Sequence, residues 1–368
     1  SNQQLHNYLD VLQDGNLLVS IASNVDNNYC SKRLLVNITI VHSATAQGAV
    51  CLDGSPPAYH LDRGHGSGLR SWIIELEPGG WCSSIPDCLD RSAKFLGSSL
   101  HMDNVSRFAG ILYNSSKDNP EFYNWNRVKV NYCDGSSFTS DVEQVDPGNK
   151  LYFRGARIYK AIIEDLWSKG LQNAENALLS GVSAGGLATI LNCDKFRALL
   201  PKYVRVKCVA DAGFFINGKT ISGTSDIHEM YQRVVTLHGS AKNLPPSCTS
   251  AMEPSLINNT LVPEYLDPQH VWDDCKKHTS NCTFGQRSII QVFAVEFLKA
   301  FLGLTPSFTR GYFITSCYSH GVIHLTHLWY SPTSPRLLLK AIAEAVADWY
   351  FDRAGFQSID PYPCARDC

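Results

Sequence analysis

The stretch LLSGVSAGGLATIL, residues Leu178–Leu191, places Ser183 among small residues, with an apolar run on each side. The run before the serine has the length of a buried strand, and the run after it continues with helical spacing. Residues 181–185, GVSAG, match the G-x-S-x-G pattern of a nucleophile elbow, a sharp turn between a strand and a helix that exposes a serine hydroxyl. The same pattern also fits a tight turn that needs small residues only for packing. The rest of the chain has to decide between these two interpretations.

Strand-like and helix-like segments alternate along the chain on both sides of this turn. Strands are predicted at 33–41, 71–77, 127–135, 204–215 and 310–317, and helices at 155–171, 228–239, 286–304 and 334–353. This alternation predicts an α/β fold of the α/β-hydrolase type, a mostly parallel sheet with helices on both faces. Residues 1–32 are polar and without pattern, so we expect a loose lead-in followed by one catalytic domain over 33–368.

The composition excludes several classes of function. The chain has 368 residues, 32 basic and 34 acidic, and contains no basic block that would indicate nucleic acid as a partner. It has no apolar run of 18 residues, so no membrane span is expected. Its 13 cysteines do not form paired C-x-x-C motifs, and neither a metal nor a cofactor is predicted.

Cysteine number and glycosylation sequons point to an oxidising compartment. Five N-x-S/T sequons begin at Asn37, Asn104, Asn114, Asn258 and Asn281. Together with the cysteines they favour a secreted protein over a cytosolic one with free thiols. Ser1 is not a start methionine, and the first thirty residues have no apolar signal core, so we expect a targeting segment to have been removed already.

His320 is the candidate base for Ser183. A serine hydroxyl needs a base to take its proton, and hydrolases of this fold order their triad as serine, acid, histidine. His320 lies in SCYSHG, just after the last predicted strand, where that order requires the histidine. His324 and His327 are nearby rivals without a strand end before them. A structural surface histidine is the alternative interpretation of His320.

The stretch PGGWC, residues 78–82, is the candidate oxyanion loop. It follows the strand at 71–77, and backbone N–H groups of such a loop, together with the residue after the nucleophile, stabilise the tetrahedral intermediate. Gly79, Gly80 and Ala184 are therefore the predicted donors, whereas Pro78 has no N–H. An ordinary turn is the alternative.

Longer segments carry a resemblance to a known family. The chain resembles the plant pectin acetylesterases, relatives of the Notum carboxylesterases, from about Val36 to Cys368. The matching segments include AVCLDGSPPAYHLDRGHGSG, GGWC, FYNWNRVKVNYCDGSSF, LYFRGARI, SGVSAGGLA, ADAGFF, HGSAKNLPPSC and DPYPC. The resemblance implies a secreted cell-wall enzyme with an α/β-hydrolase fold that removes acetyl groups from pectin through a Ser–Asp–His triad. It places the nucleophile on Ser183, the histidine on His320, and the oxyanion donors on Gly79, Gly80 and Ala184.

The triad acid has no counterpart in this chain. In the family, a buried strand ending in aspartate follows the NLPPSC segment, but here CTSAMEPSLI (residues 248–257) runs almost directly into NNTLVPEYLDPQHVWDDC. No apolar strand-like run separates the helix ending near Gly239 from the helix starting at Gln286, so a core strand is predicted to be missing. Among the remaining carboxylates, Asp267, Asp273 and Asp274 end no strand, and Asp211 matches a family position that looks structural. We assign no acid.

The resemblance also implies a set of cysteine pairs. The family commonly has cysteine where this chain has Val182 and Gly321, which suggests a family pair that is absent here. The missing strand carries a family cysteine as well, which would leave one thiol without its partner, with Cys248 as the candidate. The implied bridges are Cys51–Cys133 and Cys82–Cys88. Cys193–Cys208 is a further candidate bridge.

The sequence therefore predicts a monomeric, secreted serine carboxylesterase acting on acetylated pectin, weakened by the loss of its acid. One alternative is a non-catalytic relative that binds pectin or is simply degraded. Another is a lipid deacylase like Notum, which requires a deep apolar acyl pocket that the sequence does not reveal.

Overall fold

The computed structural model describes residues 34–216, 226–245, 267, 269–277, 281–316 and 320–360. The predicted lead-in, Cys248 and the segment around the predicted gap lie outside these described residues. All elements below belong to one unit, residues 35–368.

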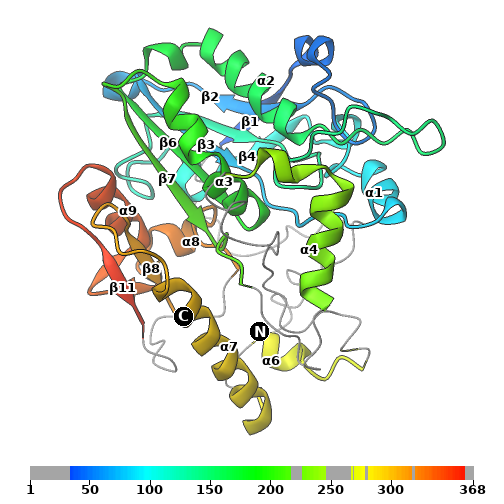
Figure 1. Cartoon of the computed structure of the whole chain (residues 1–368). Coiled ribbons are helices and arrows are strands. Elements are labelled where there is room, and N and C mark those ends of the chain that lie inside the picture. The colour runs from blue at the N-terminus through cyan, green and yellow to red at the C-terminus, as the bar shows by residue number, and fades with distance from the viewer. Residues whose placement is uncertain are drawn as a thin grey trace, which may run out of the picture. The chain divides into compact units, whose positions relative to one another are not determined.

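A seven-stranded sheet forms the centre of the fold, in the order β4-β1-β2-β5-β3-β6-β7 (Figure 1). Its strands are β1 (Leu35–Ile40), β2 (Ala58–Asp62), β3 (Ser71–Leu76), β4 (Val105–Arg107), β5 (Asn126–Val130), β6 (Asn176–Val182) and β7 (Arg205–Asp211). Two further pairs lie apart from it, β9 (Arg336–Leu337) with β10 (Lys340–Ala341), and β8 (Tyr312–Ile314) with β11 (Gln357–Ile359).

The strands β5, β3, β6 and β7 are parallel neighbours, and this part of the sheet positions the site. Leu76 pairs with Gly181, and Val182 pairs with Asp211. The three strands β3, β6 and β7 therefore end side by side, and the residues that follow them meet at one edge of the sheet.

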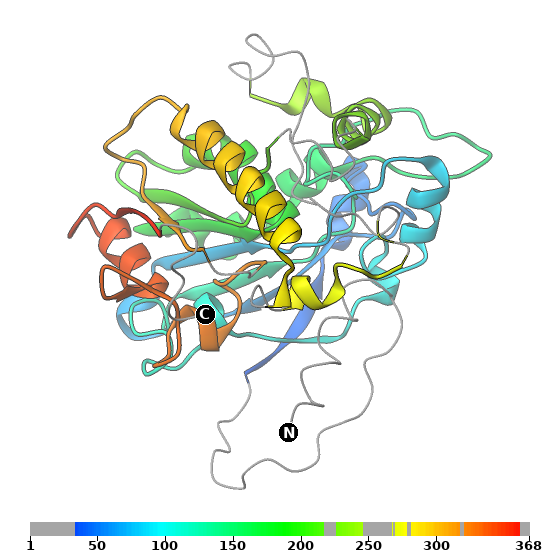
Figure 2. The same ribbon diagram turned by 90° about the horizontal axis from the view of Figure 1, so that it is seen from below.

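Helices cover both faces of the sheet (Figures 1 and 2). The helices are α1 (Ile85–Ser92), α2 (Gly155–Ser168), α3 (Ala184–Leu199), α4 (Asp226–Leu237), α6 (Asp273–Lys277), α7 (Phe284–Leu302), α8 (Thr326–Trp329) and α9 (Ile342–Tyr350). The helices α2 and α3 share one core cluster with alternate residues of the central strands, among them Ile74 and Leu179. On the other face, Lys207 of β7 bonds the carbonyl of Trp349 in α9. The predicted α/β architecture is confirmed.

Three features differ from the predicted layout. The strands β1, β2 and β4 pair antiparallel, which the sequence pattern did not indicate. The last helix begins only at Ile342, because residues 336–341 form the short β9–β10 hairpin. The strand β8 is short and pairs with β11, so the central sheet ends at β7. Within the described residues, no strand occurs between β7 and β8.

The helix α7 has a large apolar surface in contact with solvent. Thr283 and Gln286 form a capping box at its start, and only Gln286 and Ile290 are buried along its length. Phe284 and Leu302 are 87% and 62% exposed. No helix among the described residues is long and apolar enough to cross a membrane.

Four disulfides join described cysteines: Cys51–Cys133, Cys82–Cys88, Cys193–Cys208 and Cys275–Cys282. The first two are those implied by the resemblance, and the third is the further candidate. The fourth was not predicted, although its cysteines are only 7 residues apart in sequence.

Candidate active site

The candidate nucleophile Ser183 lies in a strained turn between β6 and α3. Its φ is 55°, a value that residues with a side chain rarely adopt. A Cβ on Gly181 would lie 2.2 Å from the carbonyl oxygen of Gly185, and one on Gly185 would lie 2.0 Å from that of Leu76. Both glycines of the motif are thus required by backbone contacts. Strain of this kind costs of the order of 1–3 kcal/mol and is concentrated at functional sites.

The same contacts place the elbow against the loop that follows β3. Gly185 packs on Leu76, the last residue of β3. Ala184 is the first residue of α3, and the first N–H groups of a helix have no partner within it. The Ala184 N–H is therefore free to face a ligand at the end of β3, where Gly79 and Gly80 follow.

Side chains hold the carbonyl groups of the candidate oxyanion loop. Arg91 donates to the carbonyl oxygen of Gly79 at 2.8 Å, and the Tyr132 hydroxyl donates to that of Gly80 at 2.8 Å. Because C=O and N–H point in opposite directions in a trans peptide, these bonds fix where the N–H groups of Gly80 and Trp81 point. Within the described residues, neither N–H donates a hydrogen bond.

Glycine is needed at both positions of this loop. Gly79 has a φ of 151°, and a Cβ there would lie 2.7 Å from Leu96. Gly80 has a φ of 61° and opens onto free space, because a Cβ added there would have no atom within 4 Å. Open space beside two free donors is what a substrate carbonyl requires.

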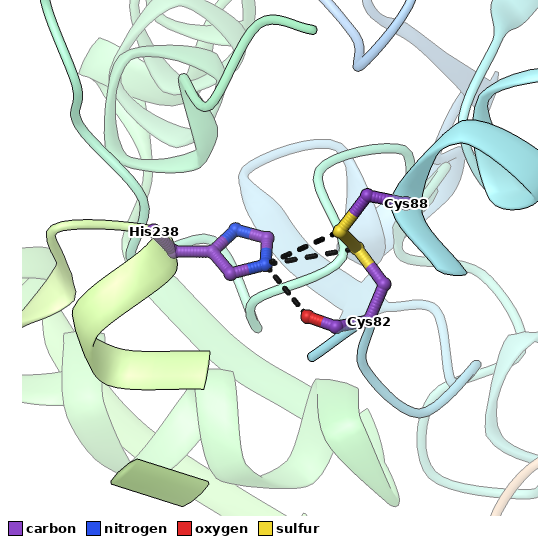
Figure 3. A group of neighbouring side chains, drawn as sticks. All are labelled: Cys82, Cys88 and His238. Carbon is purple, nitrogen blue, oxygen red and sulfur yellow. Dashed lines mark hydrogen bonds between the residues drawn. A yellow bond between two sulfur atoms is a disulfide. The ribbon is translucent and has the colours of Figure 1, made fainter. Parts of the chain in front are cut away.

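A disulfide and a histidine support the end of the loop (Figure 3). His238 Nε2 donates to the carbonyl oxygen of Cys82 at 2.8 Å and lies 3.6 Å from the sulfur of Cys82 and 3.8 Å from that of Cys88. Burial lowers the pKa of His238 to about 4, so the ring is neutral. The three side chains are close enough together to hold a metal, but the two sulfurs are bonded to each other and offer no thiolate.

The loop that carries His320 is anchored on two sides. On one side, Asp211 Oδ2 accepts from the N–H groups of Val322 at 2.5 Å and Ile323 at 2.9 Å. On the other side, Ile111 N–H donates to the carbonyl oxygen of Ile323 at 2.8 Å. The loop after His320 is thus tied to the end of β7.

Neighbours of Ser183 and His320 are in direct contact. A Cβ on Gly321 would lie 2.5 Å from Val182 Cγ1, so positions 182 and 321 lie side by side. Within the described residues, no hydrogen bond joins Ser183 Oγ to His320. Catalytic hydrogen bonds are often long before substrate binds, so this geometry is compatible with a catalytic pair.

The charges around His320 differ from those around the alternative candidate, His324. His320 is exposed to solvent, but nearby protein atoms still desolvate its ring and lower its pKa. The negative charge of Asp211 raises the pKa of His320 and so opposes this shift. Burial first, and then the nearby Lys129, lower the pKa of His324 to about 4. His320 alone of the two has a carboxylate that favours its charged form.

The other candidate acids take part in local structure. Asp267 accepts from the N–H groups of Val271 at 2.7 Å and Trp272 at 3.1 Å. Asp273 lies 3.2 Å from His270. These contacts lie within one short segment and explain the burial of Asp267 without a catalytic role.

Aromatic side chains fill the space beside the oxyanion loop. The ring of Trp81 lies 5.0 Å from that of Phe215 and 5.5 Å from that of Tyr231. Trp81, Leu187 and Tyr231 line a cavity of about 20 Å³, which has room for about one water molecule. Neither Ser183 nor His320 lines this cavity, so it is separate from the candidate acyl site.

Sequence reasoning named Ser183, His320, Gly79, Gly80 and Ala184, and the structure brings the elbow, the glycine loop and the His320 loop to one edge of the sheet. Sequence reasoning did not identify the N–H of Trp81 as a donor, Arg91 and Tyr132 as supports of the loop, or the contact of Asp211 with the His320 loop. The position of Asp211 at a strand end was the available signal for the last of these.

A serine in a strained elbow, free backbone donors after the neighbouring strand, and a histidine loop tied to the next strand are typical of one class of protein, the serine hydrolases of the α/β-hydrolase fold. The structure of the Wnt deacylase Notum from Drosophila supports the fold, with a TM-score of 0.72, 22% identity, and coverage of 90% of this chain and 99% of that one.

The family follows from sequence comparison. The profile of the Pectinacetylesterase family matches residues 29–257 and 254–368. Pectin acetylesterase 11 of Arabidopsis thaliana is 46% identical over 88% of this chain and 90% of its own length. Palmitoleoyl-protein carboxylesterase notum1a of Danio rerio is 30% identical over 61% of this chain and 46% of its own length. The chain belongs to the pectin acetylesterase family and is a carboxylic ester hydrolase.

Proposed function

We propose that this protein is a secreted serine esterase that removes acetyl groups from pectin in the plant cell wall. Ser183 is the nucleophile, His320 is the base, and backbone N–H groups of Gly79, Gly80 and Ala184 stabilise the oxyanion, with Trp81 as an added donor. The protein acts as a monomer, within a single catalytic domain over 33–368. The observation that carries the proposal is the strained Ser183 elbow packed against a glycine loop with free donors.

The chemistry proceeds in two steps. Ser183 Oγ attacks the acetyl carbonyl while its proton passes to His320, and the oxyanion lies against the free N–H groups. The C–O bond to the sugar then breaks, and His320 returns the proton to the leaving sugar hydroxyl. Water, deprotonated by His320, attacks the acetyl-serine, and acetate leaves as Ser183 regains its proton.

Sequence similarity supports an acetyl group as the acyl part. Pectin acetylesterase 11 is 46% identical over 88% of this chain, whereas notum1a is 30% identical over 61% of it. An acetyl group adds only one methyl beyond the carbonyl, whereas a lipid acyl chain needs a long apolar channel. The Notum-type lipid deacylase is therefore the weaker proposal.

Surface features support secretion. The sequon asparagines Asn37, Asn104, Asn114 and Asn281 are all exposed, as glycan attachment requires. Four disulfides close within the described residues, as expected in an oxidising compartment.

A second candidate is a non-catalytic relative that binds pectin or is degraded. The two family-profile matches meet at residues 254–257, where the sequence predicts a missing strand. The central sheet ends at β7, and α7 leaves apolar side chains such as Phe284 exposed. These observations support the loss of a sheet strand, with the family's triad acid at its end.

Acetate release from acetylated pectin separates the two candidates. The esterase releases acetate with the wild type and loses this activity by several orders of magnitude in Ser183→Ala and in His320→Gln. A folded wild type that releases no acetate would favour the binding relative. Release of palmitoleate from an acylated peptide, without acetate from pectin, would favour the lipid deacylase.

A further inference from the structure

Asp211 contacts both halves of the candidate pair, the Ser183 turn through its backbone and the His320 loop through its side chain. Its backbone carbonyl accepts from the Ser183 N–H at 2.9 Å. Its side-chain Oδ2 accepts from Val322 and Ile323, directly after His320, at 2.5 and 2.9 Å. One residue at the end of β7 thus ties the nucleophile's backbone to the base's loop.

Charge and burial at Asp211 match the needs of a group that acts on a histidine. The carboxylate is enclosed by protein and feels the charge of His320. Burial raises the pKa of Asp211, while the N–H donors of Ile323 and Val322 and the charge of His320 lower it. Oδ2 accepts from Val322 and Ile323, and the N–H of Ala212 is a third backbone donor to the carboxylate.

We propose that Asp211 is the positioning residue of His320 and takes the part that the missing family aspartate would have played. It holds the loop through Oδ2 and favours the protonated imidazole that forms when Ser183 gives up its proton. This inference rests on the proposed esterase function. It also implies that the loss of a sheet strand weakens the triad without removing its acid.

Other titratable groups lie close to Asp211 and His320. His324 faces His320 and is itself faced by Lys129 and His327. Glu75 lies behind Asp211, and burial raises its pKa to about 7. None of these residues is replaced in the variants below, but the pKa of Glu75 loses the contribution of Asp211 in Asp211→Asn. The ring proton of His320, measured below, therefore complements the pH profile.

The variant Asp211→Asn tests the inference. An amide oxygen still accepts from Val322 and Ile323, so we expect a melting temperature close to that of the wild type. Loss of the charge should lower kcat for an acetyl ester by at least about 100-fold, because the same change in a protease triad costs about 10⁴-fold. The acid limb of kcat/KM should also move to lower pH, because the carboxylate that raises the pKa of His320 is gone.

Asp267→Asn is the matched control. Asp267 is also a buried carboxylate that accepts from two backbone N–H groups, but its partners are Val271 and Trp272. Its kcat and acid limb should equal those of the wild type. Wild-type kcat in Asp211→Asn, or a loss of kcat with an unmoved acid limb, would overturn the inference and leave Asp211 a structural residue.

A measurement without any change at Asp211 keeps the inference testable if the asparagine variant does not fold. In protein with ¹⁵N-labelled histidine, with His320→Gln for assignment, the neutral His320 ring should carry its proton on Nδ1, toward the carboxylate. A proton on Nε2 would overturn the inference. Labelling of Ser183 by a fluorophosphonate tests the proposed function separately, because it does not depend on which carboxylate serves His320.

Discussion

Replacing Tyr132 by phenylalanine tests whether side chains hold the oxyanion loop in place. The ring is fully buried, and its hydroxyl donates to the carbonyl oxygen of Gly80 and accepts from the N–H of Ser137, both at 2.8 Å. Without the hydroxyl, the Gly80–Trp81 peptide is no longer fixed. The buried N–H of Ser137 and the partly buried carbonyl of Gly80 also lose their partner.

Both effects have an expected size. A buried group without a partner costs about 1–3 kcal/mol and a partly buried one costs less, so the two together should lower the free energy of unfolding by about 2–4 kcal/mol. Complete loss of one oxyanion donor costs about 10²–10³-fold in kcat. Here the donor is loosened but still present, so we expect kcat to fall about 10-fold, or about 1.4 kcal/mol, with KM nearly unchanged.

The assay compares Tyr132→Phe with Tyr59→Phe on a soluble acetyl ester, with melting followed in parallel. Tyr59 is also fully buried, and its hydroxyl donates to Asp165 and accepts from Lys169, both at 2.5 Å, away from the loop. It should lose stability and keep its kcat. An equal fall of kcat in both variants, or no fall in Tyr132→Phe, would refute the reasoning.

Three further predictions concern stability and the two loops. Removing the disulfide Cys51–Cys133, with a sequence separation of 82, should destabilise the fold by about 4.5 kcal/mol. Removing Cys82–Cys88, with a separation of 6, should destabilise it by about 2.4 kcal/mol. Only the removal of Cys82–Cys88 should lower kcat. Chemical unfolding of paired serine variants, with kinetics, checks both halves. The pKa of His238 is about 4 in the fold and 6.5 ordinarily, so its stabilisation is complete above pH 6.5 and is lost as pH falls toward 4. At pH 5 this loss is about 2 kcal/mol, and it should be absent from urea unfolding of His238→Gln. Cysteines at Val182 and Gly321 together should form a disulfide, although Gly321 has a φ of 88°, because replacing Val182 removes the Cγ1 that would lie 2.5 Å from the added Cβ. Thiol titration would count against the geometry if both cysteines remained free.

The turn around Ser183 could be predicted because its causes are local. The motif glycines, the apolar run before the serine and the helical spacing after it lie within fourteen residues, Leu178–Leu191. The same holds for Gly79 and Gly80, whose loop directly follows a recognisable strand. Family resemblance supplied the disulfide pairs, which spacing alone does not determine.

The remaining features depend on contacts between distant segments. Asp211 meets Val322 only because the loop after β8 folds back over β7, 111 residues further along the chain. The hydroxyl of Tyr132 supports Gly80, which lies 52 residues away in the sequence. The sequence pattern identifies Tyr132 only as an aromatic residue and does not reveal the partner of its hydroxyl. The antiparallel strand β2 is short and follows two prolines, so its pattern resembled a loop.

Mapping the adduct of a fluorophosphonate probe tests the central claim most directly, because the probe reacts only with a serine that a base and an oxyanion hole have activated. The wild-type chain is incubated with the probe, digested and sequenced by mass spectrometry. We expect one adduct, on Ser183, that disappears in Ser183→Ala and is strongly reduced in His320→Gln. A folded wild type without an adduct, or with its adduct on another serine, would contradict the assignment of Ser183 as the nucleophile.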